Sequence, residues 1–146
     1  MTAPTASAAA LPTAVGAPSR RTHLAVRGLQ VLLALFFAVP SASPKLVGHS
    51  SAVESFDRIG WGDWLMYAVG GVELAGAVAL LVPALAGAAA IGLIALMAGA
   101  FVMQLTVLDP PLAVTPLVFA VLLAVVARVR RRETAELIAR VRGRAA

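Results

Sequence analysis

Four apolar stretches constrain the fold of this chain more than any other feature of its sequence. They cover residues 24–42, 64–82, 88–108 and 110–127, and each is close to the roughly 20 residues that an α-helix needs to cross a bilayer. Only helices and closed barrels satisfy every backbone group inside hydrocarbon, and the alternation of polar and apolar residues that marks a barrel strand is absent here. The sequence therefore predicts an all-α bundle of four transmembrane helices that lies in the lipid bilayer.

The composition excludes a water-soluble domain and several kinds of chemistry. Of the 146 residues, 60% are hydrophobic and 13% are charged, whereas soluble domains average roughly 45–50% and 25%. Cysteine is absent, so disulfides and thiolate chemistry are excluded. The two histidines, His23 and His49, lie outside the spans, so a haem held by two histidines inside the bundle is not expected. No metal-ligand spacing occurs in the sequence, and no metal site is predicted.

The distribution of basic residues predicts the orientation of the chain in the membrane. Ten of the twelve basic residues flank the first and the last span, and only Lys45 and Arg58 lie on the other side. Lysine and arginine are enriched in the cytoplasmic segments of membrane proteins. Both termini are therefore expected to be cytoplasmic.

The two ends of the chain are expected to lie outside the bundle. Residues 1–22 are rich in alanine, proline and threonine, and this composition is typical of a disordered tail. Residues 128–146 are basic, with apolar side chains along one side of a helix, and we interpret them as a cytoplasmic segment that lies on anionic headgroups. A nucleic-acid partner is not expected, because this segment offers neither aromatic residues nor a folded module.

Two interpretations of the first span stay open. Arg20 and Arg21 precede its apolar run, and small residues at 41–43 follow it, which is the order of a twin-arginine export signal with its cleavage site. Against cleavage, Pro44 would stand directly after the cleavage point, and Arg27 interrupts the apolar run. We favour retention of this segment as the first span.

Glu73 is the residue of greatest functional interest. It lies at the middle of the second span, where an ionised carboxylate costs roughly 2.5–3.5 kcal/mol on insertion scales, so it should face the bundle and find a partner. By depth, the candidate partners are Arg27 and Gln30 in the first span and Gln104 in the third. Three roles stay open for Glu73: fixing the helix register, handling protons or a ligand, and contacting a partner subunit.

Lys45 and three aromatic residues lie near the ends of the spans opposite the termini. Lys45 follows the first span and departs from the positive-inside pattern, and a plain interfacial lysine is the interpretation that we favour. Trp61, Trp64 and Tyr67 precede or begin the second span. They are compatible with the mouth of a quinone pocket, but also with an interfacial aromatic belt, which we favour.

Two local patterns predict further features of the fold. The segment Ser51–Glu54 has the pattern of a capping box and predicts a short interfacial helix between the first and second spans. In the third span, the pairs Ala88/Gly92 and Ala95/Gly99 have the spacing of small residues that lets helices approach closely. They predict tight packing of the third span within the bundle or in a homo-oligomer.

The order of these features resembles the DoxX-like family of small bacterial four-helix membrane proteins. The resemblance covers residues 27–127 and is carried by Arg27 at the start, Lys45 after the first span, and the Glu-Leu-Ala-Gly-Ala stretch that begins at Glu73. It implies that Arg27, Lys45 and Glu73 are the polar positions shared with the family. Gln104 stands where many members have a histidine.

The resemblance also implies a function. Members of the family are similar to subunits of thiosulfate:quinone oxidoreductase, and some relatives are thought to tether soluble redox enzymes to the membrane. We therefore expect an auxiliary or anchoring membrane subunit of a quinone- or sulfur-linked oxidoreductase, in the bacterial plasma membrane. Quinone is the candidate cofactor, and no catalytic residue can be assigned. The alternative is a small transporter that uses Glu73 to handle protons or a solute.

Overall fold

The computed structural model describes residues 20–144, and no strand occurs within that range. The elements, in chain order, are α1 Arg20–Phe36, the π-helical turn η1 Phe37–Ala42, α2 Ser43–Leu46, α3 Ser50–Ile59, α4 Asp63–Leu81, α5 Pro83–Thr106, the 3₁₀ turn η2 Pro110–Ala113, α6 Val114–Val129 and α7 Arg131–Arg144. The four helical spans that are long and apolar enough to cross a membrane are Arg20–Leu46, Asp63–Leu81, Pro83–Thr106 and Pro110–Val129. These spans confirm the all-α, four-helix fold class.

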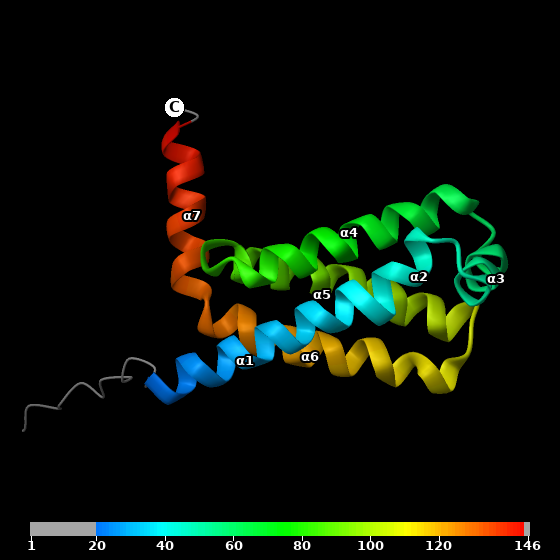
Figure 1. Cartoon of the computed structure of the whole chain (residues 1–146), viewed down its shortest axis with the longest axis horizontal. Helices are drawn as coiled ribbons and strands as arrows, with labels where there is room; N and C mark the ends of the chain where they lie inside the picture. The colour runs from blue at the N-terminus through cyan, green and yellow to red at the C-terminus, as the bar shows by residue number, and fades with distance from the viewer. Residues whose placement is uncertain (1–19, 145–146) are drawn as a thin grey trace, which may run out of the picture.

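The spans lie side by side, with the start of α1 and the whole of α7 at one end and α3 across the other (Figure 1). We call these the terminal end and the loop end. α5 packs between α4 and α6, and the first span packs against α4 and α6. Residues 20–22, which the sequence assigns to the N-terminal tail, are helical, whereas the remainder of the expected tail lies outside the described residues.

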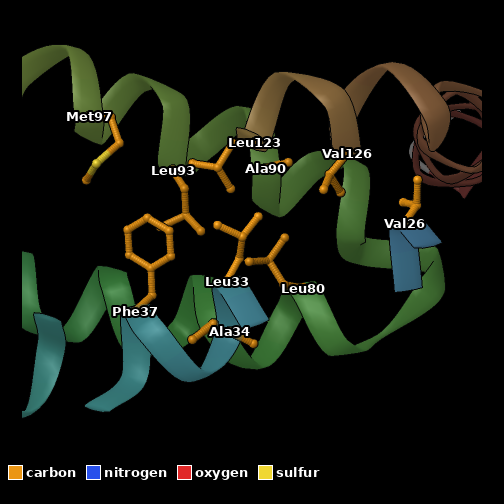
Figure 2. Packing of buried hydrophobic residues seen from close by; sticks show 11 residues of the cluster. Val26, Leu33, Ala34, Phe37, Leu80, Ala90, Leu93, Met97, Leu123 and Val126 are labelled. Atoms are coloured by element: carbon orange, nitrogen blue, oxygen red, sulfur yellow. The ribbon is translucent and has the colours of Figure 1, made fainter. Parts of the chain in front are cut away.

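The hydrophobic core fills the half of the bundle nearer the terminal end. Each span contributes one leucine to its centre, and these four side chains are 2% exposed or less. Figure 2 shows them converging, together with Phe37, whose ring points across the bundle toward Leu93. The four leucines are Leu33, Leu80, Leu93 and Leu123. This half of the molecule is therefore closely packed.

The first span is longer than the sequence predicts and contains a π-helical turn. Its end is expected shortly after Pro40, but the helix continues to Leu46. Pro40 lies inside the turn and has no N–H to donate. The N–H of Ser43 bonds instead to the carbonyl of Ala38, five residues back, and the wider turn absorbs the proline without ending the helix. The span therefore extends far enough to include Lys45.

The connection between α4 and α5 is shorter than expected. The sequence predicts a turn bracketed by Pro83 and Gly87, but Val82 alone is extended, and Pro83 is the first residue of α5. Proline suits this position, because the first N–H groups of a helix have no partner within the helix. Gly87 consequently lies inside α5, where it contacts Thr134 of α7.

A short helix forms between the first two spans, but its N-terminal cap differs from the expected one. α3 begins at Ser50, and the residue that caps it is His49, whose ring accepts a hydrogen bond from the N–H of Ser51. The capping box predicted for Ser51–Glu54 is therefore wrong. His49 takes this role because its extended backbone turns its side chain toward the first N–H groups of the helix, which are unpaired. At the other end, Gly60 stops the helix in a left-handed conformation.

The small-residue pairs of the third span lie at exposed positions of α5 within the described residues. Ala88, Gly92, Ala95 and Gly99 are all exposed, and a Cβ atom added at either glycine would meet nothing within 4 Å. The prediction that they bring α5 into tight contact inside the bundle is wrong, because the apolar face that α5 buries is a different one. A contact in a homo-oligomer stays a prediction.

Candidate functional site

Glu73 and Lys45 form a buried ion pair near the middle of the bundle. Nζ of Lys45 donates to Oε2 of Glu73 at 2.8 Å and to Oε1 at 3.1 Å. The Glu73 side chain is 4% exposed and the Lys45 side chain 18%. An isolated charge in a membrane span is costly, and a close opposite charge offsets much of that cost. Glu73 therefore faces the bundle interior, where Lys45 is its partner.

The partner of Glu73 is not the one that the sequence predicts. Depth favours Arg27 or Gln30, but both bind the end of α4, about two helical turns from Glu73. Lys45 takes their place because a helical side chain points back toward the N-terminus of its helix. Its long chain runs from the end of the span into the bundle, and Nζ also binds the carbonyl of Ser41 at 2.8 Å. The interpretation of Lys45 as a plain interfacial lysine is wrong.

A glycine lets the first span approach α4 at this level. Gly70 lies one turn before Glu73 in α4, and a Cβ atom placed on it would be 3.0 Å from Cβ of Lys45 and 3.1 Å from Cγ of Leu46. Small residues allow two helix backbones to come close together in membranes. Gly70 therefore provides the space in which Lys45 reaches Glu73.

The ion pair lies in the wall of a cavity of about 570 Å³ in the loop-end half of the bundle. All four spans and α3 contribute to a lining that is mostly aliphatic and aromatic. Small-molecule sites typically occupy about 300–1,000 Å³ and combine an apolar lining with few polar groups. The polar lining residues are Ser41, Lys45, Ser55, Glu73, Gln104 and Thr115, and the phenylalanines are Phe36, Phe37, Phe56 and Phe119.

α3 covers this cavity at the loop end. Phe56 and Ile59 line the cavity from α3. The far side of the helix is tied to the connection between α5 and α6 by Arg58, which binds the carboxylate of Asp109 at 3.4 Å and the carbonyl of Val107 at 3.3 Å. Because these groups are exposed, the tie is weak. The cover is therefore held mainly by its apolar contacts.

The three aromatic residues near the start of α4 do not form one cluster. All three are exposed, by 60% for Trp61, 65% for Trp64 and 48% for Tyr67, but only Trp61 lines the cavity. α4 turns Leu65 and Val69 toward the cavity, so the residues beside them in the sequence point elsewhere. The interpretation of all three as the mouth of a pocket is wrong for Trp64 and Tyr67. Their exposed rings suit the interfacial belt that we favour.

Gln104 also lines the cavity, close to the end of α5. Its Oε1 accepts a hydrogen bond from the N–H of Asp109 at 3.4 Å. Within residues 20–144, its amide nitrogen Nε2 has no hydrogen-bond partner. Gln104 is thus not a partner of Glu73, but it brings a second donor to the same cavity.

Arg27 and Gln30 hold the end of α4 at the opposite end of the bundle. Nε2 of Gln30 donates to the carbonyl of Leu80 at 2.9 Å, and Nη1 of Arg27 donates to the carbonyl of Leu81 at 2.8 Å. The last carbonyl groups of a helix have no partner within the helix, and Arg27 also places a positive charge at the negative end of the helix dipole. Both residues therefore cap α4, and neither lies in the cavity.

Arg130 is a buried polar residue that the sequence does not single out. It is 8% exposed, and its Nη2 donates to Oε1 of Gln30 at 3.0 Å while its Nη1 donates to Oε1 of Glu133 at 2.9 Å. In the sequence it is one of a run of arginines, and only the spacing to Glu133 indicates an ion pair on a helix. Its burial depends on Gln30, 100 residues away, which no local pattern reveals.

The fold and the site together define a class of protein: a small integral membrane protein of four helices, with a charged pair beside an apolar cavity. The chain belongs to the DoxX-like family, because the model of that family matches residues 28–127. This match confirms the family that the sequence resembles. A search of curated proteins and a search of solved structures found no match.

Proposed function

We propose that this DoxX-like protein is an auxiliary membrane subunit of a quinone-linked oxidoreductase, and that its cavity binds the quinone head group. The observation that carries the proposal is the buried Lys45–Glu73 pair in the wall of an apolar cavity of about 570 Å³. A quinone presents a flat apolar ring with carbonyl oxygens at opposite edges. It therefore needs an apolar pocket with a few well-placed hydrogen-bond donors.

The cavity offers both the donors and the apolar surface. Lys45 supplies a charged donor, and its longer contact, to Oε1 of Glu73 at 3.1 Å, is the one that a ligand carbonyl can replace. Gln104 supplies an amide N–H that is unpaired within the described part of the chain. The phenylalanine rings of the lining supply surfaces for stacking. In this proposal, a partner enzyme supplies the electrons and this chain holds the quinone in the bilayer.

The two tryptophans provide the test of quinone binding. Trp61 lines the cavity and Trp64 does not, so a Trp64→Phe variant reports on the cavity and a Trp61→Phe variant is its matched control. Purified protein in detergent is titrated with a short-chain ubiquinone analogue, and tryptophan fluorescence is recorded. We expect saturable quenching of Trp61 and only linear, collisional quenching of Trp64. Lys45→Met should weaken the saturable binding by about tenfold or more, because a charged hydrogen bond is lost.

The same titration shows how the proposal fails. If both tryptophans are quenched linearly, or if Lys45→Met binds the analogue as tightly as the native chain, the cavity is not a quinone site. The subunit role is tested separately, by quinone reduction in membranes with and without this chain. An oxidoreductase whose quinone reduction is unchanged by loss of the chain does not use it as a subunit.

A second candidate function is a transporter that moves protons or a polar solute through Glu73. One observation favours it, the burial of an acidic side chain at the middle of α4. The apolar core of the terminal-end half does not favour it, because buried apolar side chains separate Glu73 from that end among residues 20–144. Proton or solute flux into proteoliposomes of the pure protein, if Glu73→Gln abolishes it, would support transport. An absence of flux would contradict transport and leave quinone binding as the proposed function.

A further inference from the structure

α7 carries an apolar surface that the bundle does not cover. Thr134, near its start, is buried against the bundle, whereas Ile138 and Val141 farther along are 50% and 62% exposed. α7 runs across the terminal end of the bundle and extends beyond it (Figure 1). Its second half therefore has no packing partner among residues 20–144.

Contacts at the start of α7 fix the direction in which its faces point. A Cβ atom on Gly87 of α5 would collide with Oγ1 of Thr134, so α7 lies directly on the first turns of α5. Oγ1 of Thr134 donates to the carbonyl of Arg130 at 3.1 Å, and Nη2 of Arg130 donates to Gln30 of α1 at 3.0 Å. The contacts with Gly87 and Gln30 place the start of the helix against two spans at once.

The exposed apolar residues continue the face that rests on the bundle. Val141 follows Thr134 by seven residues, which is about two helical turns, and Ile138 follows it by four. Side chains at these spacings share one face of a helix. Because Thr134 points at the end of a membrane-spanning bundle, the face that it shares with Val141 points toward the bilayer beside that bundle.

Arginines flank this apolar face. α7 contains five arginines and two glutamates. Arg142 lies near one edge of the apolar face and Arg144 near the other, since they follow Ile138 by four residues and Val141 by three. An amphipathic helix with an apolar face and flanking arginines suits the boundary between acyl chains and anionic headgroups, where arginine side chains reach out to phosphates.

We propose that α7 lies in the membrane interface at the terminal end and binds anionic lipid headgroups through its arginines, with Ile138 and Val141 inserted among the acyl chains. The bundle sets the orientation of this helix, and lipid charge sets how firmly its second half is held. The proposal rests on contacts outside the cavity and is independent of the proposed quinone site.

The absence of cysteine allows a clean spin-label test in the full chain. Val141→Cys and Ala139→Cys differ by two residues and so place a nitroxide on opposite faces of α7. The protein is reconstituted in vesicles of phosphatidylcholine alone or mixed with phosphatidylglycerol. The measured quantity is the electron-spin relaxation of each nitroxide. We expect oxygen, which partitions into acyl chains, to accelerate the relaxation of the label at 141. A water-soluble nickel chelate should accelerate the relaxation of the label at 139. This contrast should be larger with phosphatidylglycerol.

A matched pair of charge variants identifies the source of the lipid dependence. Arg142→Gln with Arg144→Gln should reduce the phosphatidylglycerol-dependent part of the contrast by about tenfold or more, since each arginine near an anionic surface is worth roughly fivefold in binding. Arg20→Gln with Arg21→Gln removes the same charge from α1 and should leave the phosphatidylglycerol-dependent contrast between the two labels unchanged. A label at 141 that is relaxed by the nickel chelate in both vesicles overturns the proposal. Protection at 141 only in native membranes would also overturn it, and would indicate a protein partner.

Discussion

Single residues decide the energetics of the cavity, because Glu73 places a carboxyl group in the middle of a membrane span. Its only close counter-charge among the described residues is Lys45, whose Nζ lies 2.8 Å from Oε2. Removal of one member of a buried pair leaves the other charge uncompensated, which is much more costly than replacement of both. The two single variants and the double variant are therefore expected to differ in a defined way.

Lys45→Met should lower the free energy of unfolding by about 3 kcal/mol, because it strands the Glu73 carboxylate. Glu73→Leu should lower it by somewhat less, because the Lys45 side chain that it leaves without a partner is 18% exposed. The double variant Lys45→Met with Glu73→Leu should recover most of the loss. The measurement is denaturant unfolding in mild detergent, followed by circular dichroism. Additive losses in the double variant would mean that the two residues do not interact.

Gly70 offers a second test at the residue scale. Gly70→Ala places a methyl group 3.0 Å from Cβ of Lys45, and such overpacking typically costs about 1–3 kcal/mol. We expect it to displace Lys45 and to weaken the saturable quenching of Trp61 by the quinone analogue. Gly71→Ala is the matched control, because a Cβ atom there would meet nothing within 4 Å. Equal effects of the two substitutions would contradict the close approach at Gly70.

At the terminal end of the bundle, a hydrogen-bond network that is separate from the cavity joins several helices. Gln30 is fully buried and binds two elements besides its own, through the carbonyl of Leu80 at the end of α4 and through Arg130 beside α7. Because one side chain satisfies both groups, its loss leaves a buried carbonyl and a buried guanidinium without their partner. The network therefore holds α1, α4 and α7 together.

Gln30→Leu should lower the free energy of unfolding by about 1–3 kcal/mol, the cost of leaving buried polar groups unpaired. The same variant should bind the quinone analogue normally, because it acts about two helical turns of α4 away from Glu73. Denaturant unfolding and Trp61 quenching, measured on the same protein, check the two halves of this prediction. Loss of quinone binding in Gln30→Leu without loss of stability would place Gln30 in the site.

The molecule as a whole has a packed half and a hollow half, and its orientation decides which side of the membrane the hollow half faces. The positive-inside pattern predicts that the terminal end is cytoplasmic. With no native cysteine, Glu54→Cys in α3 and Gly143→Cys in α7 give one exposed reporter at each end. We expect a membrane-impermeant maleimide to label position 54 in intact cells and position 143 only after lysis. Labelling of 143 in intact cells would reverse the topology.

The sequence by itself determined the number and nature of the spans, because each membrane helix must satisfy its own backbone and its apolar residues are contiguous along the chain. It also identified Glu73 as buried and partnered, since the energetic cost of a charge at midspan is a local property. It could not identify the partner. Lys45 reaches Glu73 only because a π-helical turn carries the first span past Pro40 and because Gly70 leaves room for it.

The tertiary structure alone decided which polar residues contact one another and which residues line the cavity. Trp61 and Trp64 are three residues apart, yet only Trp61, which lies in the connection before α4, lines the cavity. The sequence around them does not distinguish the two. Gln30 and Arg130 meet across 100 residues of chain. Hydropathy reports the depth of a residue along its span but not its angle around the helix, and the angle is set by packing between helices distant in sequence.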